Sequence, residues 1–388
     1  MTSILKYGGI DNLYIFFKKE ATIKNVVSFF LIIFCILYIK YHAMKTLPCL
    51  FLLLLFASCA AIHNTPKSKN PNVKETPNII YSFVDQNGNF YPNNWQKTFG
   101  NPPNNAKKNE YSLVKLASEK NILSNFKGNE QEILNRIKKE VSNKKRIIIF
   151  VHGFNSTARK STQNYELARK HMNINPKTDE IIQFYWDGLT SQSILGGAKI
   201  WFDATNYSQM AGEFGLRRIL NVIKNKDIYI ISHSRGASVV ISALNSNPIK
   251  DNQKEEVVNI HNVDFENSKD LLENNNKITC IMLAPAIGVN DFYKADSEND
   301  FCDLSHQVQT IHITINNTDP LLKKFVGFLS KTLKPTDLGF KEDAYNTLCE
   351  YFILFEKTDF TGQKVHDFDS YIQNPKFIEI LEAYGLSK

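Results

Sequence analysis

Residues Ile230–Val240, IISHSRGASVV, bring two serines, a histidine and an arginine to the end of an apolar run. The segment then continues into small residues that a helix tolerates. Ser and Gly are common in turns, so one interpretation is a plain turn between a strand and a helix. The other interpretation makes Ser234 a nucleophile. A serine hydroxyl is a poor nucleophile until a base takes its proton, so this chemistry requires a histidine, and an acid to orient it, elsewhere in the chain.

Short apolar runs typical of buried strands alternate with helical patterns from about Glu110 onward. The predicted strands are Arg146–Val151, Glu180–Trp186, Asp227–Ile231, Ile278–Leu283, Thr310–Ile315 and Tyr351–Phe355. The clearest helical patterns are Asn129–Lys144, Gln209–Lys224 and Pro320–Thr332. Strands that alternate with helices predict a mostly parallel sheet with helices on both faces.

Polar residues follow four of the predicted strands. Ligands bind at the carboxyl ends of the strands in such sheets, so these residues form the candidate site. In chain order the four segments are His152-Gly153-Phe154-Asn155-Ser156, Ser232-His233-Ser234-Arg235-Gly236, Asn316-Asn317-Thr318-Asp319-Pro320 and, after a short loop, Val365-His366-Asp367.

Together these segments resemble the α/β-hydrolase family, and in particular bacterial esterase-like and lipase-like serine hydrolases, over about Arg146–Lys388. The family's nucleophile elbow is a small-x-Ser-x-small sequence between a strand and a helix, which Ser232–Gly236 matches with Ser232 in place of the more common Gly. The resemblance implies an α/β-hydrolase fold, with a mostly parallel central sheet and helices on both faces. The family order of nucleophile, acid and histidine implies Ser234, Asp319 and His366 as a catalytic triad.

The resemblance also implies roles for the residues around this triad. The backbone N–H groups of Phe154 and Arg235 would form an oxyanion hole, which stabilises the charge that develops during acyl transfer. The supporting residues of the two motifs are His152, Gly153, His233 and Gly236.

Several assignments keep an alternative. Asp319 directly precedes a predicted helix, so it is either the triad acid or only a helix cap. Asp291 follows the preceding predicted strand and is the alternative acid. The Arg235 side chain either contacts an anionic substrate or is solvated. Asp187 precedes the serine in the chain and is interpreted as a cap or loop residue.

The N-terminal region contains two apolar runs. Val26–Ile39 has 14 residues, fewer than the roughly 20 that a membrane-spanning helix needs. Met44–Ala61 has the layout of a secretory signal peptide. Its ending, FASC, resembles the lipobox of bacterial lipoproteins, in which Cys59 is lipidated and becomes the mature N-terminus. We expect translation to start at Met44; the alternative is that Val26–Ile39 anchors the chain in a membrane.

These observations predict four segments. Residues 1–43 are an upstream extension or a membrane segment, and residues 44–59 are a lipoprotein-type signal peptide. Residues 60–108 are rich in Pro, Asn and Lys and form a tether, with a hairpin signal at Asn87-Gly88. Residues 109–388 form the hydrolase domain. Either interpretation of the N-terminus puts this domain outside the cytoplasm, in a bacterial cell envelope.

Composition excludes some other functions. The net charge is +7, but no basic run is interleaved with aromatic residues, so we expect no nucleic-acid partner. The six cysteines form no C-x-x-C pair and no zinc-ligand spacing, so we expect no metal and no cofactor.

The predicted function is an extracytoplasmic serine hydrolase for an ester, thioester or similar acyl bond. The alternative is a degenerate fold that acts as a membrane-anchored binding module. Polar segments at Asn245–Lys277 and Gly288–Gln307 favour a small-molecule or polymer-linked acyl substrate over a triglyceride. The sequence predicts neither the acyl-chain preference nor the oligomeric state.

Overall fold

The computed structural model describes residues 61–67, 78–104, 111–191, 194–245, 271–294, 297, 300–326 and 336–388. The chain divides into two units, residues 1–58 and Cys59–Lys388, and every described residue belongs to the second. The segment Val26–Ile39, the signal segment 44–59 and Cys59 lie outside the described residues. Within the described ranges, no helix combines the length and the apolar character that crossing a bilayer requires.

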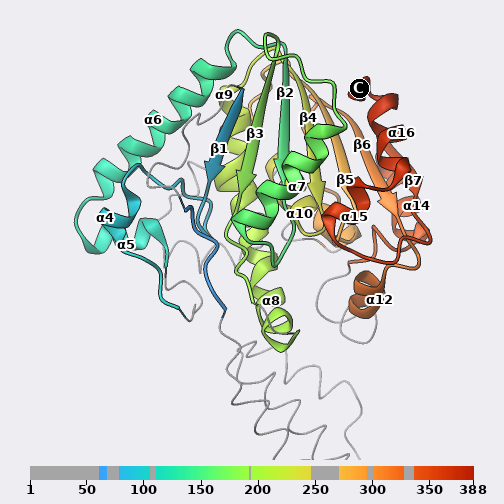
Figure 1. The fold of residues 1–388 in the computed structure, drawn as a ribbon, viewed down its shortest axis with the longest axis horizontal. Helices are drawn as coiled ribbons and strands as arrows, with labels where there is room; N and C mark the ends of the chain where they lie inside the picture. Colours follow the sequence, from blue (N-terminus) through green and yellow to red (C-terminus); the bar gives the residue numbers. More distant parts are fainter. Residues whose placement is uncertain are drawn as a thin grey trace, which may run out of the picture. The chain divides into compact units, whose positions relative to one another are not determined.

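Seven strands form one sheet in the order β1-β3-β2-β4-β5-β6-β7 (Figure 1). Each pair of neighbouring strands is parallel, which confirms the predicted sheet. The strands are β1 (Ile79–Phe83), β2 (Arg146–Val151), β3 (Asp179–Tyr185), β4 (Asp227–His233), β5 (Lys277–Leu283), β6 (Val308–Ile315) and β7 (Phe355–Asp359).

Helices cover both faces of this sheet because its central strands are apolar on both sides. In β2, Ile147, Ile149 and Val151 belong to one buried core and Ile148 and Phe150 to the other, as the two-residue period of a strand requires. The first core is completed by α6 (Leu123–Val141), α8 (Ile194–Met210), the π-helix η1 (Ala211–Leu216), α9 (Arg217–Val222), α10 (Gly236–Leu244) and α14 (Glu342–Tyr351). The second is completed by α4 (Trp95–Phe99), α5 (Leu113–Glu119), α7 (Ala158–Lys170), α15 (Phe368–Ile372) and α16 (Pro375–Ala383).

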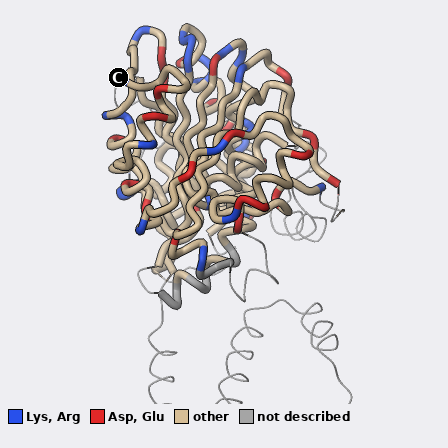
Figure 2. The backbone as a smooth tube through the Cα atoms, turned by 90° about the vertical axis from the view of Figure 1, so that its right-hand side faces the viewer, with Lys and Arg blue, Asp and Glu red and all other residues tan. Residues whose placement is uncertain are grey.

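Two shorter elements lie after β5 and β6. The 3₁₀ helix η3 spans Val289–Phe292, and α12 spans Pro320–Val326. Figure 1 shows α8 and α12 at the carboxyl ends of the strands, along the lower edge of the sheet in that view. Lys and Arg are interspersed with Asp and Glu along the described backbone (Figure 2).

The last predicted strand was misplaced. The run Tyr351–Phe355 is not a strand: helix α14 ends at Tyr351, and β7 begins at Phe355. β7 is an edge strand with one apolar and several exposed residues, so its own sequence lacks the continuous apolar run of a buried strand. Phe352 and Leu354 pack against the core from the connection, while Ile353 is exposed.

The predicted helices agree with the structure only in part. Asn129–Lys144 lies largely within α6, which begins earlier, at Leu123. The pattern Gln209–Lys224 is not one regular helix, because it passes through the π-helix η1 before α9. Gly212 of η1 lies so close to α10 that a Cβ there would be 2.3 Å from the Val239 carbonyl oxygen. The helix predicted from Pro320 begins there and is described to Val326.

Residues 60–108 are not simply a tether. Ile79–Phe83 is the edge strand β1, paired with β3, and Phe90, Tyr91 and Trp95 are buried. The chain does turn at Asn87-Gly88, but the hairpin is limited to one antiparallel bridge, between Val84 and Phe90. The high content of Pro, Asn and Lys obscured a short apolar strand that completes the domain.

Candidate active site

Ser234 lies on the turn between β4 and α10, in a backbone conformation that is rare for a residue other than glycine. Its φ angle is 51°, in the left-handed region. Its N–H donates to the Leu283 carbonyl at 2.9 Å, and its carbonyl accepts from the Ala286 N–H at 3.2 Å. The backbone of the loop after β5 therefore holds the turn. A Cβ at Gly236 would lie 2.6 Å from the His152 carbonyl oxygen, which explains the small residue at that position.

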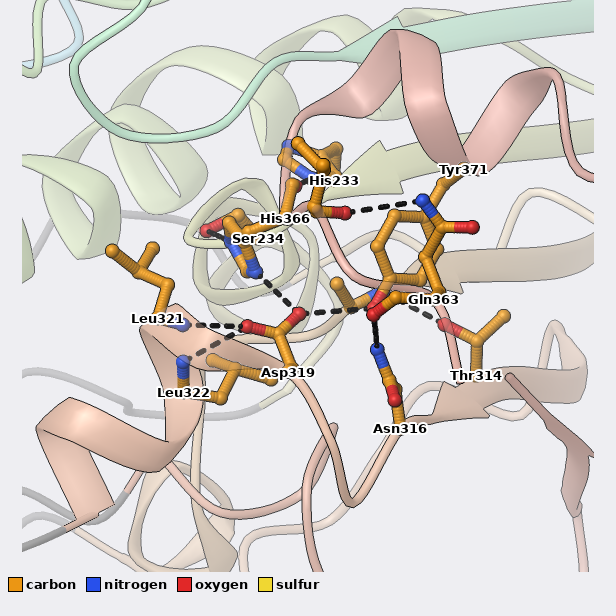
Figure 3. Close-up of polar contacts among 12 residues, drawn as sticks. His233, Ser234, Thr314, Asn316, Asp319, Leu321, Leu322, Gln363, His366 and Tyr371 are labelled. Atoms are coloured by element: carbon orange, nitrogen blue, oxygen red, sulfur yellow. Dashed lines mark hydrogen bonds and ion pairs between the residues drawn. The ribbon is translucent and has the colours of Figure 1, made fainter. Parts of the chain in front are cut away.

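His366 lies between Ser234 and Asp319 (Figure 3). Its Nε2 is 2.9 Å from Ser234 Oγ, and its Nδ1 is 2.8 Å from Asp319 Oδ2. The three residues follow β4, β6 and β7, whose carboxyl ends meet at one edge because the strands are parallel. The structure thus brings together the three residues expected from the sequence; their catalytic roles stay a prediction.

Asp319 uses its two carboxylate oxygens for different purposes. Oδ1 accepts from the backbone N–H groups of Leu321 and Leu322, at 2.9 and 3.0 Å, in the first turn of α12. Oδ2 accepts from His366 and from the Tyr371 hydroxyl, the latter at 3.0 Å. Asp319 can therefore cap α12 and orient the imidazole of His366 at the same time.

The same contacts set the charge of Asp319. Burial raises the pKa of this carboxyl. Hydrogen bonds from His366, from the Leu322 N–H and from Tyr371, together with the nearby imidazole, lower the pKa by more than burial raises it. The net pKa lies below the usual value, so Asp319 is ionised at neutral pH. An ionised Asp319 accepts a hydrogen bond from Nδ1–H, which leaves the Nε2 lone pair of His366 facing the Ser234 hydroxyl.

Tyr371 is a residue of this site that the sequence did not indicate. Its hydroxyl donates to Asp319 and accepts from Asn316 Nδ2 at 3.1 Å, and its ring stacks on Phe360. Asn316 Nδ2 also donates to the Gln363 carbonyl at 2.7 Å, which ties the end of β6 to the loop that precedes His366 (Figure 3). No motif spacing announces these contacts, since each joins residues more than 40 positions apart.

His233, inside the elbow, holds the loop that carries His366. Its Nε2–H donates to the His366 backbone carbonyl at 2.7 Å, and its ring stacks on Phe368. Burial, followed by the proximity of the His366 imidazole, keeps the pKa of His233 well below its usual value. His233 is therefore neutral and acts as a hydrogen-bond donor to the backbone.

His152 orients the predicted oxyanion loop. Burial lowers its pKa to about 4, so the ring is neutral. Its Nε2 accepts from the Trp186 N–H at 3.1 Å, so Nδ1 carries the proton and donates to the Gly153 carbonyl at 2.8 Å. The carbonyl and the N–H of a trans peptide point in opposite directions, so this bond also fixes the direction of the Phe154 N–H.

The same loop lies directly against the elbow. A Cβ at Gly153 would be 2.9 Å from Ser234 Cβ, so only glycine fits without displacing the serine. The backbone N–H groups of Phe154 and Arg235 have no acceptor among the described residues. Both N–H groups thus stay available for a ligand atom beside Ser234.

The Arg235 side chain is buried, so the interpretation that it is solvated is wrong, and its visible partners are groups of the protein itself. It donates to the Ala286 carbonyl at 2.9 Å and to Ser208 Oγ at 3.3 Å. Its Nη2 is 3.5 Å from Asp291 Oδ1. Burial lowers the pKa of the guanidinium, and Asp291 opposes this shift. Arg235 therefore joins α8 to the loop after β5.

Asp291, the alternative acid, is occupied by other partners. Besides Arg235, it accepts from the Gly288 N–H through Oδ2 at 2.9 Å. The geometry favours Asp319 over Asp291 as the partner of His366.

Apolar side chains lie beside Ser234. Trp201, Ala286 and Leu322 form a small buried cluster, against which Phe154 and Phe340 pack while partly exposed. The Phe154 ring meets Trp201 edge-on at 5.1 Å. This environment suits an uncharged acyl group. Within the described ranges, no three His, Cys, Asp or Glu side chains are grouped so that they could hold a metal ion.

Solved structures similar to this chain include esterase 2 from Thermogutta terrifontis, with 12% identity, 63% of this chain and 85% of that chain covered, and a TM-score of 0.27. Est1E from Butyrivibrio proteoclasticus has 11% identity, with 63% of this chain and 88% of that chain covered, and a TM-score of 0.27. No curated protein sequence matches the chain.

The family described as "alpha/beta hydrolase of unknown function (DUF900)" matches residues 126–330, slightly more than half of the chain. The matched range includes Ser234 and Asp319 and ends before His366. With the seven-stranded parallel sheet and its two layers of helices, this match identifies an α/β-hydrolase fold, and the chain belongs to the DUF900 family of α/β hydrolases.

Proposed function

We propose that the protein is a serine hydrolase that cleaves an ester, thioester or similar acyl bond. The observation that carries the proposal is the position of His366, whose two ring nitrogens lie 2.9 Å from Ser234 Oγ and 2.8 Å from Asp319 Oδ2. This is the hydrogen-bond pattern of a nucleophile, its base and the acid that orients the base.

In the proposed reaction, Ser234 Oγ attacks the acyl carbonyl carbon while His366 Nε2 takes the hydroxyl proton. The carbonyl oxygen becomes an oxyanion, which the N–H groups of Phe154 and Arg235 stabilise. His366 then gives its proton to the departing alcohol or thiol, which leaves an acyl ester on Ser234. Water, deprotonated by His366, attacks this ester, and His366 then returns the proton to Ser234 Oγ as the bond to the acyl carbon breaks and the acid is released. Asp319 stabilises the imidazolium in both steps.

We also propose that the chain is a lipoprotein of a bacterial cell envelope, with its hydrolase domain outside the cytoplasm. The support for this location is the sequence Met44–Ala61, which combines a charged start, an apolar core and the FASC ending. Intact-mass analysis of the membrane-extracted protein tests it: an unmodified Cys59, or a chain that begins at Met1, contradicts lipidation.

A fluorophosphonate probe tests the catalytic proposal, because it reacts only with an activated serine. We expect the probe to label Ser234, and Ser234→Ala to abolish labelling and esterase turnover while the protein stays folded. Ser232→Ala, two residues earlier in the same motif, is the matched control and should keep most of both signals. Ordinary turnover by Ser234→Ala contradicts the assignment, and absent labelling of the wild type favours a degenerate binding module.

A further inference from the structure

The segment Ala61–Asn64, which follows the predicted lipidation site directly, is fixed to the hydrolase domain. Ile62 and Thr190 exchange two backbone hydrogen bonds of 2.9 Å. His63 Nδ1 lies 2.6 Å from Asp187 Oδ2, with both side chains fully buried. The Asn64 N–H donates to the other oxygen of Asp187 at 2.8 Å. The chain therefore enters the domain at the loop that follows β3, and Asp187, interpreted from the sequence as a cap or loop residue, binds this entry segment.

The entry point lies beside the candidate active site. Asn64 Oδ1 accepts from the N–H of Ala158, the first residue of α7, at 2.8 Å, and Asn64 Nδ2 donates to the Trp186 carbonyl at 3.3 Å. Trp186 in turn contacts His152 of the oxyanion loop. A second link runs from the Ser191 N–H to Asn155 Oδ1, at 2.7 Å. The segment Ala61–Asn64 and Ser234 thus share the carboxyl edge of the sheet.

This position limits how a lipidated domain can face a membrane. Three peptide units separate Cys59 from Ile62, and an extended chain covers at most about 3.5 Å per residue, so the span is at most about 10 Å. A domain of this length has a radius of gyration of about 20 Å. The tether is too short for the domain to turn its carboxyl edge away from the bilayer.

Exposed apolar side chains occur on the same edge. Ile62, in the entry segment, has 43% of its surface exposed, and Val365, next to His366, has 46%. The partly exposed Phe154 and Phe340 also pack at this edge. Such side chains can make apolar contacts with a surface of lipid headgroups and acyl chains.

We propose that the carboxyl edge of the sheet lies on the membrane surface and that the substrate is an acyl ester carried by a component of the bilayer. This inference rests on the proposed function and on lipidation of Cys59. The scissile ester would lie at headgroup depth, which agrees with the apolar cluster beside the nucleophile.

Lipid quenching tests the orientation. An environment-sensitive fluorophore is attached to Val365→Cys or to Ile353→Cys, which lie after and before the same strand, β7, and are both exposed. Cys349→Ser serves as the background, since Cys349 is a partly exposed free thiol. In vesicles of phosphatidylethanolamine and phosphatidylglycerol, brominated lipids should quench the fluorophore at 365 at least threefold more than the one at 353. Equal quenching, or stronger quenching at 353, overturns the orientation.

Substrate access is tested with a flexible Gly/Ser insertion of about 20 residues after Cys59, which has a mean end-to-end distance of about 25 Å. The natural lipoprotein and the insertion variant are compared on p-nitrophenyl butyrate in solution and on a fluorogenic phospholipid ester in the vesicles. We expect equal turnover of the soluble ester and a fivefold or greater loss on the vesicle-borne ester. Equal turnover of both esters by the two forms overturns the substrate assignment. No turnover of either ester, with no probe labelling, contradicts the proposed function itself, while the quenching result still decides the orientation.

Discussion

The Nε2–H of His233 donates to the backbone carbonyl of His366 at 2.7 Å, so the histidine next to the candidate nucleophile holds the loop that carries the candidate base. Two adjacent elbow residues, His233 and Ser234, thus contact the backbone and the side chain of the same residue. The position of the imidazole relative to the serine therefore depends on a group that takes no part in proton transfer.

Replacing His233 by Leu should lower kcat about 10- to 100-fold with little change in KM, because the His366 loop loses its fixed position. His233→Gln, which keeps an N–H donor, should recover part of this loss. Steady-state kinetics and the rate of fluorophosphonate labelling measure the effect. His312→Leu is the matched control, since His312 is another buried histidine whose partners, Tyr384 and Thr358, lie outside the site. If His312→Leu loses as much kcat as His233→Leu, the loss comes from general destabilisation and not from a displaced His366 loop.

Asp319→Asn should lower kcat by about 10⁴-fold, because an amide in place of the carboxylate stabilises the wrong imidazole tautomer. The fold should survive, since Asn is as good a helix cap as Asp. Asp319→Ala removes the cap, so its free energy of unfolding should be about 1 kcal/mol lower than that of Asp319→Asn. Asp291→Asn is the comparison variant and should change kcat only a few-fold. A large loss in Asp291→Asn beside a near-normal Asp319→Asn would move the acid to the loop after β5.

The buried, neutral His152 should make the protein less stable in mild acid. Its pKa is lowered to about 4 by burial, whereas an unfolded histidine titrates near pH 6.5. The unfolded state therefore binds the proton more tightly, and the stability that the neutral ring contributes is present above about pH 6.5 and is lost as the pH falls. Linkage predicts a loss of about 2 kcal/mol between about pH 8 and pH 5 from this residue. Urea unfolding at the two pH values measures it. His152→Gln, which keeps a donor and an acceptor, should show a pH dependence smaller by about this amount; an unchanged dependence contradicts the assignment.

Asn64→Ala should lower kcat about tenfold, although Asn64 touches neither Ser234 nor His366, because it removes the contacts that join the entry segment to Ala158 and Trp186. Asn64→Asp keeps the acceptor for the Ala158 N–H and should recover part of the activity. Soluble-ester kinetics of both variants, with KM determined separately, check this. A normal kcat in Asn64→Ala means that the segment does not position the oxyanion loop.

The local pattern of the sequence was sufficient for the central strands and for the elbow. β2, β4 and β5 are buried on both faces, so each appears as a continuous apolar run, and the polar residues that end these runs mark the edge where ligands bind. Ser234 was recognisable because a strand, a serine between small residues and a helix follow one another directly in the chain. β7 was misplaced because this edge strand has only one buried apolar residue. β1 was missed because its short apolar run lies in a stretch rich in Pro, Asn and Lys.

The chain order of Ser234, Asp319 and His366 suggested a triad, but only the tertiary structure decided which acid faces the histidine. Asp319 and Asp291 both follow predicted strands, and the choice depends on which loop reaches the end of β7. Contacts between distant segments, such as Tyr371 with Asp319 and His63 with Asp187, leave no periodic signal, since each depends on how the strands are ordered in the sheet. Sequence alone determined the central strands and the residue types at their ends, because these are local properties. The partners of Asp319, Arg235 and the entry segment were decided by packing, which brings together residues that local patterns do not connect.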